Sequence, residues 1–169
     1  MKRIIFIVTI ALLLPNSFFA QTKKEVNSDS EKQSPFAKSY DHVNDFEKIL
    51  TSNQITTLNT TLKSFEKKSL YKIIIVTTSS IQPYTDIYQY TQDLDKYLDS
   101  TFRMRPTIII LLSKQLRQIQ ILGEDSIRYK MTDDQTKEII SNFAVPEFKK
   151  GDYYKGLEAA VNEIIKKLQ

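Results

Sequence analysis

After residue 40, the apolar residues of the chain alternate between helical spacing and short continuous runs. From about residue 52 to 67 they recur every three or four positions, which predicts an amphipathic helix. The run YKIIIVTT that follows is short, rich in β-branched residues and followed by turn-prone residues, so it predicts a buried strand. The segment YTDIYQYTQDLDKYLDS returns to helical spacing, and TIIILLS, residues 107–113, predicts a second buried strand. A helix between two buried strands implies a right-handed parallel crossover.

The remaining pattern predicts one more strand and two more helices. QIQIL alternates apolar and polar residues, which suits an antiparallel neighbour of the 107–113 strand with one wetter face. One helix is expected to begin at Asp133 and Asp134 and to end before Pro146. The last helix carries its apolar residues on one face: Leu157, Ala160, Val161, Ile164, Ile165 and Leu168. We therefore predict an α/β fold, a three-layer α/β/α sandwich with a mixed central sheet and about four helices.

The first 39 residues are typical of an exported protein. Lys2 and Arg3 precede an apolar run over residues 4–14, and Ala20 offers a cleavage site, so residues 1–20 are predicted to be a signal peptide. The run is shorter than the roughly 20 residues that a spanning helix needs. Residues 21–39 are polar and charged, which indicates a linker before a folded domain at 40–169. We expect a periplasmic or secreted protein, cleaved near Ala20.

Composition limits the classes of function. At 169 residues and 41% hydrophobic content the chain suits one domain with a real core. The absence of cysteine excludes disulfides and a lipid-modified cysteine. The net charge of +4 falls further when Lys2 and Arg3 are removed, so nucleic acid is not an expected partner. We expect no membrane span in the mature chain, a monomer, and an unknown protein partner in the cell envelope.

Two local stretches each admit a structural and a functional interpretation. Thr132 and Gln135 fit a capping box, and acidic residues in a first helical turn offset the helix dipole, so Asp133 and Asp134 can be explained as a helix start or as a binding site. In PEFKKGDYYKG, a glycine permits a turn, Asp152 caps the next helix, and Phe148 and Tyr153 pack beneath it. The alternative is a surface for a partner, made by the two adjacent tyrosines.

Several strings resemble the TPM domain family over roughly residues 40–168. They are VNDFEKILTSNQITTLNTTLKSFE, IIIVTTSSI, IIILLSKQLRQIQI and, most specifically, MTDDQTKEIISNFAVPEFKKGDYYKGLEAAVNEII. The resemblance implies a small exported or membrane-tethered module. In some members it implies binding of calcium or another divalent cation, and in plant members acid phosphatase activity.

The resemblance also implies candidate metal ligands. Asp133 stands at the family's threonine–aspartate position and Asp45 at its early aspartate, with Asp134 as a neighbour that can supply more oxygen. Calcium prefers six to eight oxygens, and Glu124 or Asp125 can supply part of that shell. If these residues form a site, Asp133 must point into a cleft at the strand ends where Asp45 meets it.

Other positions depart from the family pattern. FRMRPT stands where relatives carry an asparagine–glycine loop, and Ser126 and Arg128 replace the usual glycine and glutamate. An arginine in place of a carboxylate lowers the local affinity for a cation. The only histidine, His42, is expected to be a solvated surface residue, and no P-loop or nucleophile elbow is present. The expected function is a non-enzymatic binding module, with or without a divalent cation; the alternative is a metal-dependent acid phosphatase.

Overall fold

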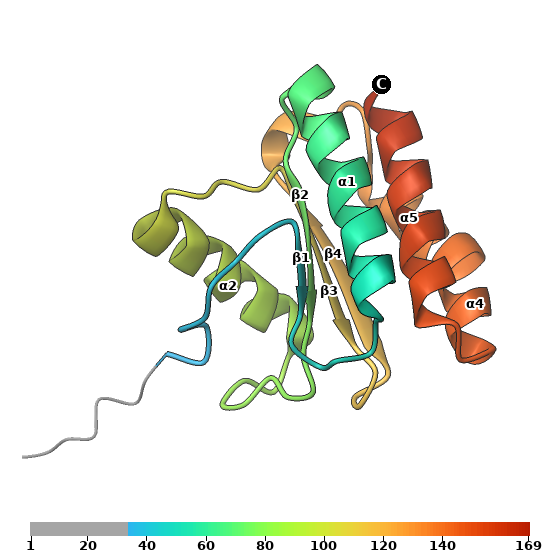
Figure 1. Ribbon diagram of the computed structural model, residues 1–169. Coiled ribbons are helices and arrows are strands. Elements are labelled where there is room, and N and C mark those ends of the chain that lie inside the picture. Colours follow the sequence, from blue (N-terminus) through green and yellow to red (C-terminus); the bar gives the residue numbers. More distant parts are fainter. Residues whose placement is uncertain (1–33) are drawn as a thin grey trace, which may run out of the picture. The chain divides into compact units, whose positions relative to one another are not determined.

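The structure, a computed structural model, describes residues 34–169 of the chain. The predicted signal peptide and most of the predicted linker lie outside these residues. Within them, four strands form one sheet in the order β1-β2-β3-β4 (Figure 1). The strands are β1 (Val43–Asp45), β2 (Ile73–Thr77), β3 (Ile108–Ser113) and β4 (Gln118–Gly123). The first three run parallel and β4 runs antiparallel to β3, which confirms the mixed sheet.

Each face of the sheet has its own apolar cluster. Consecutive residues of β2 and of β3 belong alternately to the two clusters, which is why both strands are continuous apolar runs in the sequence. Helix α2 (Ile87–Phe102) covers one face, and helices α1 (Ser52–Ser69) and α5 (Tyr153–Leu168) cover the other (Figure 1). The predicted three-layer sandwich is therefore confirmed.

The helix that begins at the aspartate pair does not end before Pro146, so that prediction was wrong. Helix α3 (Asp133–Ile139), a π-helical turn (Ile140–Ala144) and helix α4 (Val145–Lys149) follow one another without a break. Proline lacks an N–H, and its ring would clash with a carbonyl four residues earlier in a regular α-helix. The wider π turn just before Pro146, in which the Val145 N–H donates to Ile140 O, accommodates the ring. Counted as one segment, these elements bring the α-helical segments of residues 34–169 to the expected four, besides a short 3-10 turn at Asp125–Ile127.

Capping boxes begin both α1 and α3, and the second of them is the predicted Thr132–Gln135 box. The side chain of Thr51 accepts from the N–H of Gln54, and the side chain of Gln54 accepts from the N–H of Thr51. Thr132 and Gln135 repeat the arrangement at the start of α3. The helix-start interpretation of the acidic stretch therefore holds locally, because Thr132 caps the helix and Asp133 and Asp134 fill its first turn.

The turn between α4 and α5 follows the structural interpretation of PEFKKGDYYKG. Gly151 has a φ of 84°, in the left-handed region that favours glycine. Asp152 Oδ1 accepts from the backbone N–H three residues on at 3.0 Å, and the rings of Phe148 and Tyr153 stack with centroids 5.4 Å apart. A side chain at Gly156 would come within 2.3 Å of the Phe148 ring, so this glycine lets α5 lie against α4.

The packed domain reaches back beyond its predicted start at Tyr40. Phe36 is only 3% exposed and belongs to the cluster beneath α2. Its ring lies edge-on to Tyr90, with centroids 4.9 Å apart. Residues 34–39 therefore include a buried anchor rather than linker alone. No helix between residues 34 and 169 has the length and apolar character that crossing a membrane requires.

Candidate functional site

The carboxylate of Asp45 is occupied by the protein's own hydrogen-bond donors. Oδ1 accepts from the Thr77 hydroxyl at 2.5 Å and from the Ile49 N–H at 3.1 Å, and Oδ2 accepts from the Leu50 N–H at 2.8 Å. Asp45 is the last residue of β1, and these bonds fold the following loop back towards α1. These bonds give Asp45 a structural role that does not require a ligand.

The other four predicted ligands lie at the opposite end of the sheet. Asp45 stands level with Thr77 and Leu112, near the ends of β2 and β3. Because β4 is antiparallel, its last residue, Gly123, pairs with Ile108 at the start of β3. Four residues of strand, about 13 Å, separate the two levels. Asp45 therefore does not meet Asp133, contrary to the geometry expected for a shared cleft.

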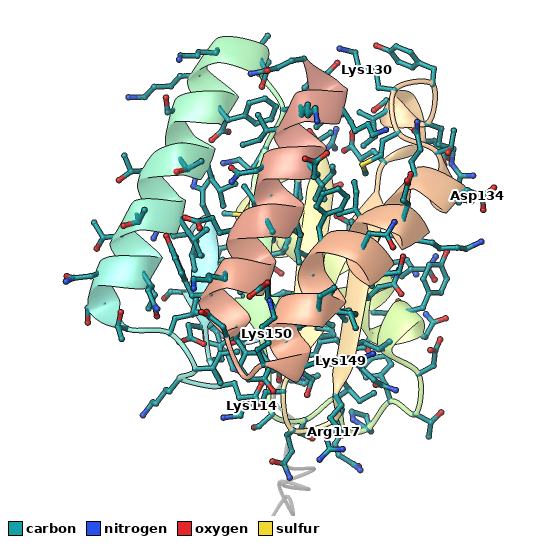
Figure 2. The ribbon with its side chains drawn as sticks, turned by 90° about the vertical axis from the view of Figure 1, so that its right-hand side faces the viewer. Lys114, Arg117, Lys130, Asp134, Lys149 and Lys150 are labelled. Atoms are coloured by element: carbon teal, nitrogen blue, oxygen red, sulfur yellow. The ribbon has the colours of Figure 1, made fainter. Side chains whose placement is uncertain are left out.

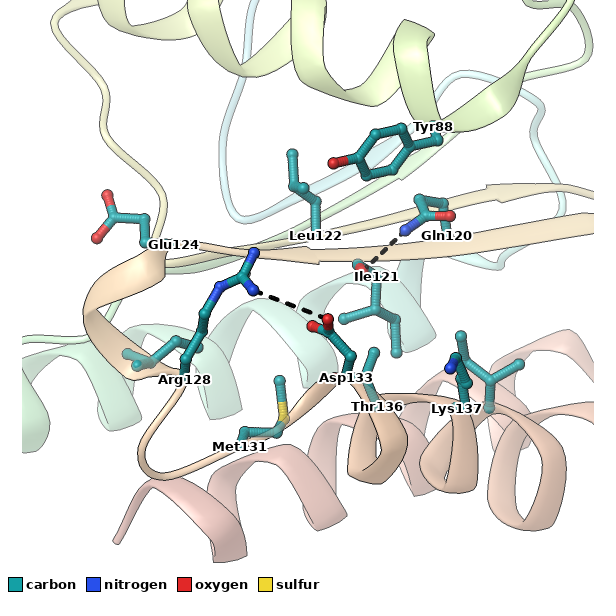
Figure 3. Close-up of a pocket in the computed structure, with 13 residues that line it drawn as sticks. Tyr88, Gln120, Ile121, Leu122, Glu124, Arg128, Met131, Asp133, Thr136 and Lys137 are labelled. Carbon is teal, nitrogen blue, oxygen red and sulfur yellow. Dashed lines mark hydrogen bonds and ion pairs between the residues drawn. The ribbon is translucent and has the colours of Figure 1, made fainter.

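Arg128 contacts two of the four remaining carboxylates. Its Nε contacts Asp125 Oδ1 at 2.8 Å. Its Nη1 lies 3.8 Å from Asp133 Oδ2 (Figure 3). Asp134 Oδ1 lies 3.2 Å from Lys137 Nζ, and Glu124 Oε2 accepts from the hydroxyl of Ser126 at 3.1 Å. These groups are exposed to solvent, and within residues 34–169 no three histidine, aspartate or glutamate side chains are placed to share a metal ion. Calcium binding stays a prediction.

The same region contains two hollows, one on each side of β4. The first, of about 330 Å³, lies between β4 and α3, and the second, of about 380 Å³, lies between β4 and α2. Figure 3 shows β4 between Tyr88 of α2 on one side and Asp133, Thr136 and Lys137 of α3 on the other. Tyr88, Leu122, Gly123, Glu124 and Arg128 line both hollows. We call these two adjoining hollows, together with the edge of β4 between them, the β4 groove.

The floor of the β4 groove is an unpaired strand edge. In the described part of the chain, β4 pairs with β3 alone. The Glu124 N–H donates to Thr107 O, and in an antiparallel pair every second residue directs its backbone groups towards the partner strand. Counting back from Glu124, the residues of β4 that face β3 are Leu122, Gln120 and Gln118. The N–H and C=O groups of Ile119, Ile121 and Gly123 consequently point to the open side. One of these groups has a local partner: Gln120 Nε2 donates to Ile121 O at 3.0 Å (Figure 3).

His42 is buried, so the prediction of a solvated surface residue was wrong. The residue is 6% exposed, with Nδ1 3.0 Å from Asp41 Oδ1 and Nε2 2.6 Å from Glu66 Oε2. Lys63 and Lys72 complete the group through ion pairs of 2.6 and 2.8 Å to the two carboxylates. Asp41 adjoins His42 in sequence, but Glu66 is far along α1, and no local pattern links the two.

Both carboxyl groups beside His42 have shifted pKa values. Burial acts to raise the pKa of Asp41, but hydrogen bonds from Lys63 and His42 outweigh it and hold the pKa well below its ordinary range. Burial likewise opposes the shift at Glu66, where hydrogen bonds from Lys72 and His42 lower the pKa. Both carboxylates therefore remain charged at neutral pH, and their contacts tie the start of β1 to α1 and to Lys72, just before β2.

A mixed four-stranded sheet with α2 on one face and α1, α5 and the α3–α4 segment on the other defines a small α/β sandwich. The family model of the TPM domain matches residues 43–167, and the chain belongs to this family.

Two solved structures share the fold. The solution NMR structure of the N-terminal domain of a protein from P. gingivalis superposes with a TM-score of 0.68 at 20% identity, covering 78% of this chain and 84% of that one. The N-terminal domain of the cg2496 protein from Corynebacterium glutamicum gives 0.58 at 20% identity, covering 79% and 83%. None of the curated proteins compared with the chain matches it.

Proposed function

We propose that the chain is a non-enzymatic binding module of the cell envelope, and that its β4 groove takes an extended segment of a partner protein as an added strand. The observation that carries the proposal is the open edge of β4, where the outward backbone groups of Ile119, Ile121 and Gly123 pair with no second strand. The edge at Ile121 and Gly123 lies between the two hollows. Backbone hydrogen bonds to such an edge supply affinity for many peptides, and pockets for alternate side chains supply specificity.

The two hollows fit the alternation of a strand. Successive side chains of an added strand point to opposite faces of the sheet, so one set would enter the hollow beside α3 and the other the hollow beside α2. Apolar residues line the first hollow, with Ile121, Met131 and Ile140 among them, while Tyr88 and Leu122 line both. We therefore expect the partner segment to carry apolar or aromatic residues at alternate positions.

The groove favours a single peptide over a second copy of this chain. Side chains of α2 and α3 stand on both sides of the strand edge, which leaves room for one extended chain rather than for another sheet flanked by its own helices (Figure 3). Binding requires the Gln120 side chain to release Ile121 O. That step costs little, because the exchange replaces one hydrogen bond by another.

In this proposal a divalent cation is not needed for partner binding. A calcium ion between Asp125 and Asp133 would have to displace Arg128, which contacts both carboxylates. The described residues offer no specific geometric support for the phosphatase alternative, which rests on family membership.

Selection from a display library of ten-residue unstructured peptides tests the proposal. The selected peptides are expected to shift the amide signals of Ile119, Ile121 and Gly123 in NMR spectra. N-methylation of alternate peptide amides, one set at a time, should abolish binding for one set only, because only alternate groups face β4.

A matched pair of variants completes the test. Ile119→Pro removes an outward N–H and leaves the ladder to β3 intact, whereas Ile119→Val retains the N–H. Binding should be lost in the first variant and kept in the second. Binding that survives Ile119→Pro, equal effects of the two N-methylated sets, or dimerisation of the free protein through β4 would each contradict the proposal.

A further inference from the structure

The largest of the hollows described here lies at the other end of the sheet, away from Arg128 and Asp133. It has a volume of about 730 Å³ and sits between the end of β3, the turn into β4 and the loop from α4 to α5. That volume is within the roughly 300–1,000 Å³ common for small-molecule sites. Apolar residues from four elements form much of its wall: Leu112, Ile119, Val145, Phe148 and Tyr153.

Cations surround the opening of this hollow. Arg117, Lys149 and Lys150 line it, and Lys114 Nζ lies 5.4 Å from the centre of the Tyr153 ring. Figure 2 shows these four side chains gathered around the lower end of α4, while Asp134 lies on a distant part of the same face. They come from two separate segments, the β3–β4 turn and the end of α4, so the fold rather than the sequence assembles the cluster.

Nearby carboxylates do not neutralise the whole cluster. Glu147 pairs with Lys150 at 2.6 Å. Glu47 accepts from the backbone N–H groups of Lys114 and Gln115 at 2.9 and 2.7 Å. Its carboxylate therefore lies against the backbone of the β3–β4 turn. Among residues 34–169, Arg117 and Lys149 form no ion pair, and both are exposed. An apolar cavity with two available cations at its mouth is complementary to a ligand with an apolar body and one anionic end.

We propose that this hollow binds a long-chain aliphatic carboxylate, with its head at Arg117 and Lys149 and its chain over Phe148 and Leu112. The planar guanidinium of arginine matches a carboxylate with two parallel hydrogen bonds, and a second cation nearby strengthens them. The alkyl chain gains from burial against the apolar walls, in proportion to the number of methylenes removed from water. Neither the head nor the chain alone uses both features of the cavity.

Calorimetric and NMR titrations of the purified protein with dodecanoate, below its micelle concentration, test this inference. Dodecanoate should bind saturably and shift the ring signals of Phe148 and Tyr153. Acetate, which has the head without the chain, and dodecyltrimethylammonium, which has the chain with the opposite charge, should each bind at least about tenfold more weakly. Equal binding of either probe would overturn the inference, and so would dodecyl phosphate binding in the absence of dodecanoate binding.

A charge-matched pair of variants locates the site. Arg117→Gln with Lys149→Gln should raise the Kd for dodecanoate about tenfold or more, since both cations contact the head. Lys67→Gln with Lys68→Gln removes the same charge from the last turn of α1, outside the hollow, and should leave the Kd unchanged. All four side chains are exposed, so folding should be preserved. An unchanged Kd in the first variant, or an equal loss in both, would contradict the assigned site.

Discussion

The two edge strands of the sheet, β1 and β4, differ in how their outward backbone groups are paired. At the β1 edge, the outward N–H of Val43 donates to Asn59 Oδ1 of α1 at 3.1 Å, so a side chain from a neighbouring helix closes the edge. At the β4 edge, the one outward group with a side-chain partner is Ile121 O, and its partner comes from the adjacent residue, Gln120, which can swing away. Proteins usually shorten or cover an edge strand to prevent unwanted pairing. Only the β1 edge of this domain follows that rule.

Length adds to the contrast between the edges. β1 spans three residues and β4 spans six, so only β4 is long enough to offer a ladder of several hydrogen bonds. The residues around β1 are also bound into a buried polar network through Asn44, whose amide donates to Ile75 O and accepts from the Asp41 N–H. The difference indicates that β1 is tied into the fold through its outward groups, whereas most outward groups of β4 have no partner among residues 34–169.

The largest expected effect is at Asp45, which secures the closed edge. Asp45→Ala leaves the Thr77 hydroxyl and two backbone N–H groups without their acceptor, so the free energy of unfolding should fall by about 3 kcal/mol. The control is Asp134→Ala, which changes an exposed acidic residue in the first turn of α3. Urea unfolding of the two variants should be compared. A loss below about 1 kcal/mol at Asp45 would show that the loop does not depend on this carboxylate.

Opening the β1 edge should cost less. Asn59→Ala removes the acceptor of the Val43 N–H, which is buried, and should lower the free energy of unfolding by about 1–2 kcal/mol. The Val43 amide should then exchange with solvent faster. Thr60→Ala, at the adjacent exposed position of α1, is the control and should change neither quantity. Unchanged exchange at Val43 in the Asn59 variant would mean that the bond does not protect this edge.

Lowering the pH should weaken the contacts that Asp41 and Glu66 make around the start of β1. Because the folded-state pKa values of Asp41 and Glu66 lie below their ordinary 3.8 and 4.5, the stabilisation is present above those ordinary values and is lost as the pH falls through the lower folded ones. The effect should stay within about 1 kcal/mol, since both carboxylates are partly exposed. Between about pH 5 and pH 2, the window in which these carboxylates become protonated, the free energy of unfolding should fall less steeply with decreasing pH in Asp41→Asn with Glu66→Gln than in the wild type. Equal slopes for variant and wild type would exclude this origin.

The sequence predicted the interior of the fold better than its edges. The β2 and β3 runs and the helical stripes are set by burial, which leaves a strong periodic signal, and the capping boxes are local. β1 was not recognised as a strand, because three residues that include Asn44 and Asp45 carry no apolar run. The burial of His42 depends on Glu66, which only the fold brings near.

For the candidate site too, the fold decides which of the predicted residues lie together. β4 was correctly predicted to be antiparallel, and a strand that reverses direction delivers the following residues to the opposite end of the sheet. Applying that rule would have separated Asp133 from Asp45 in advance. The partnership of Arg128 with Asp125 and Asp133 could not be foreseen in detail, although the i,i+3 spacing of Asp125 and Arg128 gave a hint.

The smallest expected effect concerns Asp133, at the open-edge end. Its side chain is 77% exposed and lies 3.8 Å from Arg128, while Thr132 caps the helix, so the main loss in Asp133→Asn is the interaction with the helix dipole. The free energy of unfolding should fall by about 0.3–1 kcal/mol. Because Arg128 already contacts Asp125 and Asp133, calcium up to about millimolar, the weak end of protein sites, should shift no NMR signals near them. Saturable shifts at Asp125, Asp133 and Asp134 that disappear in the Asn variant would instead establish a cation site beside the β4 groove, independent of Asp45 at the closed edge.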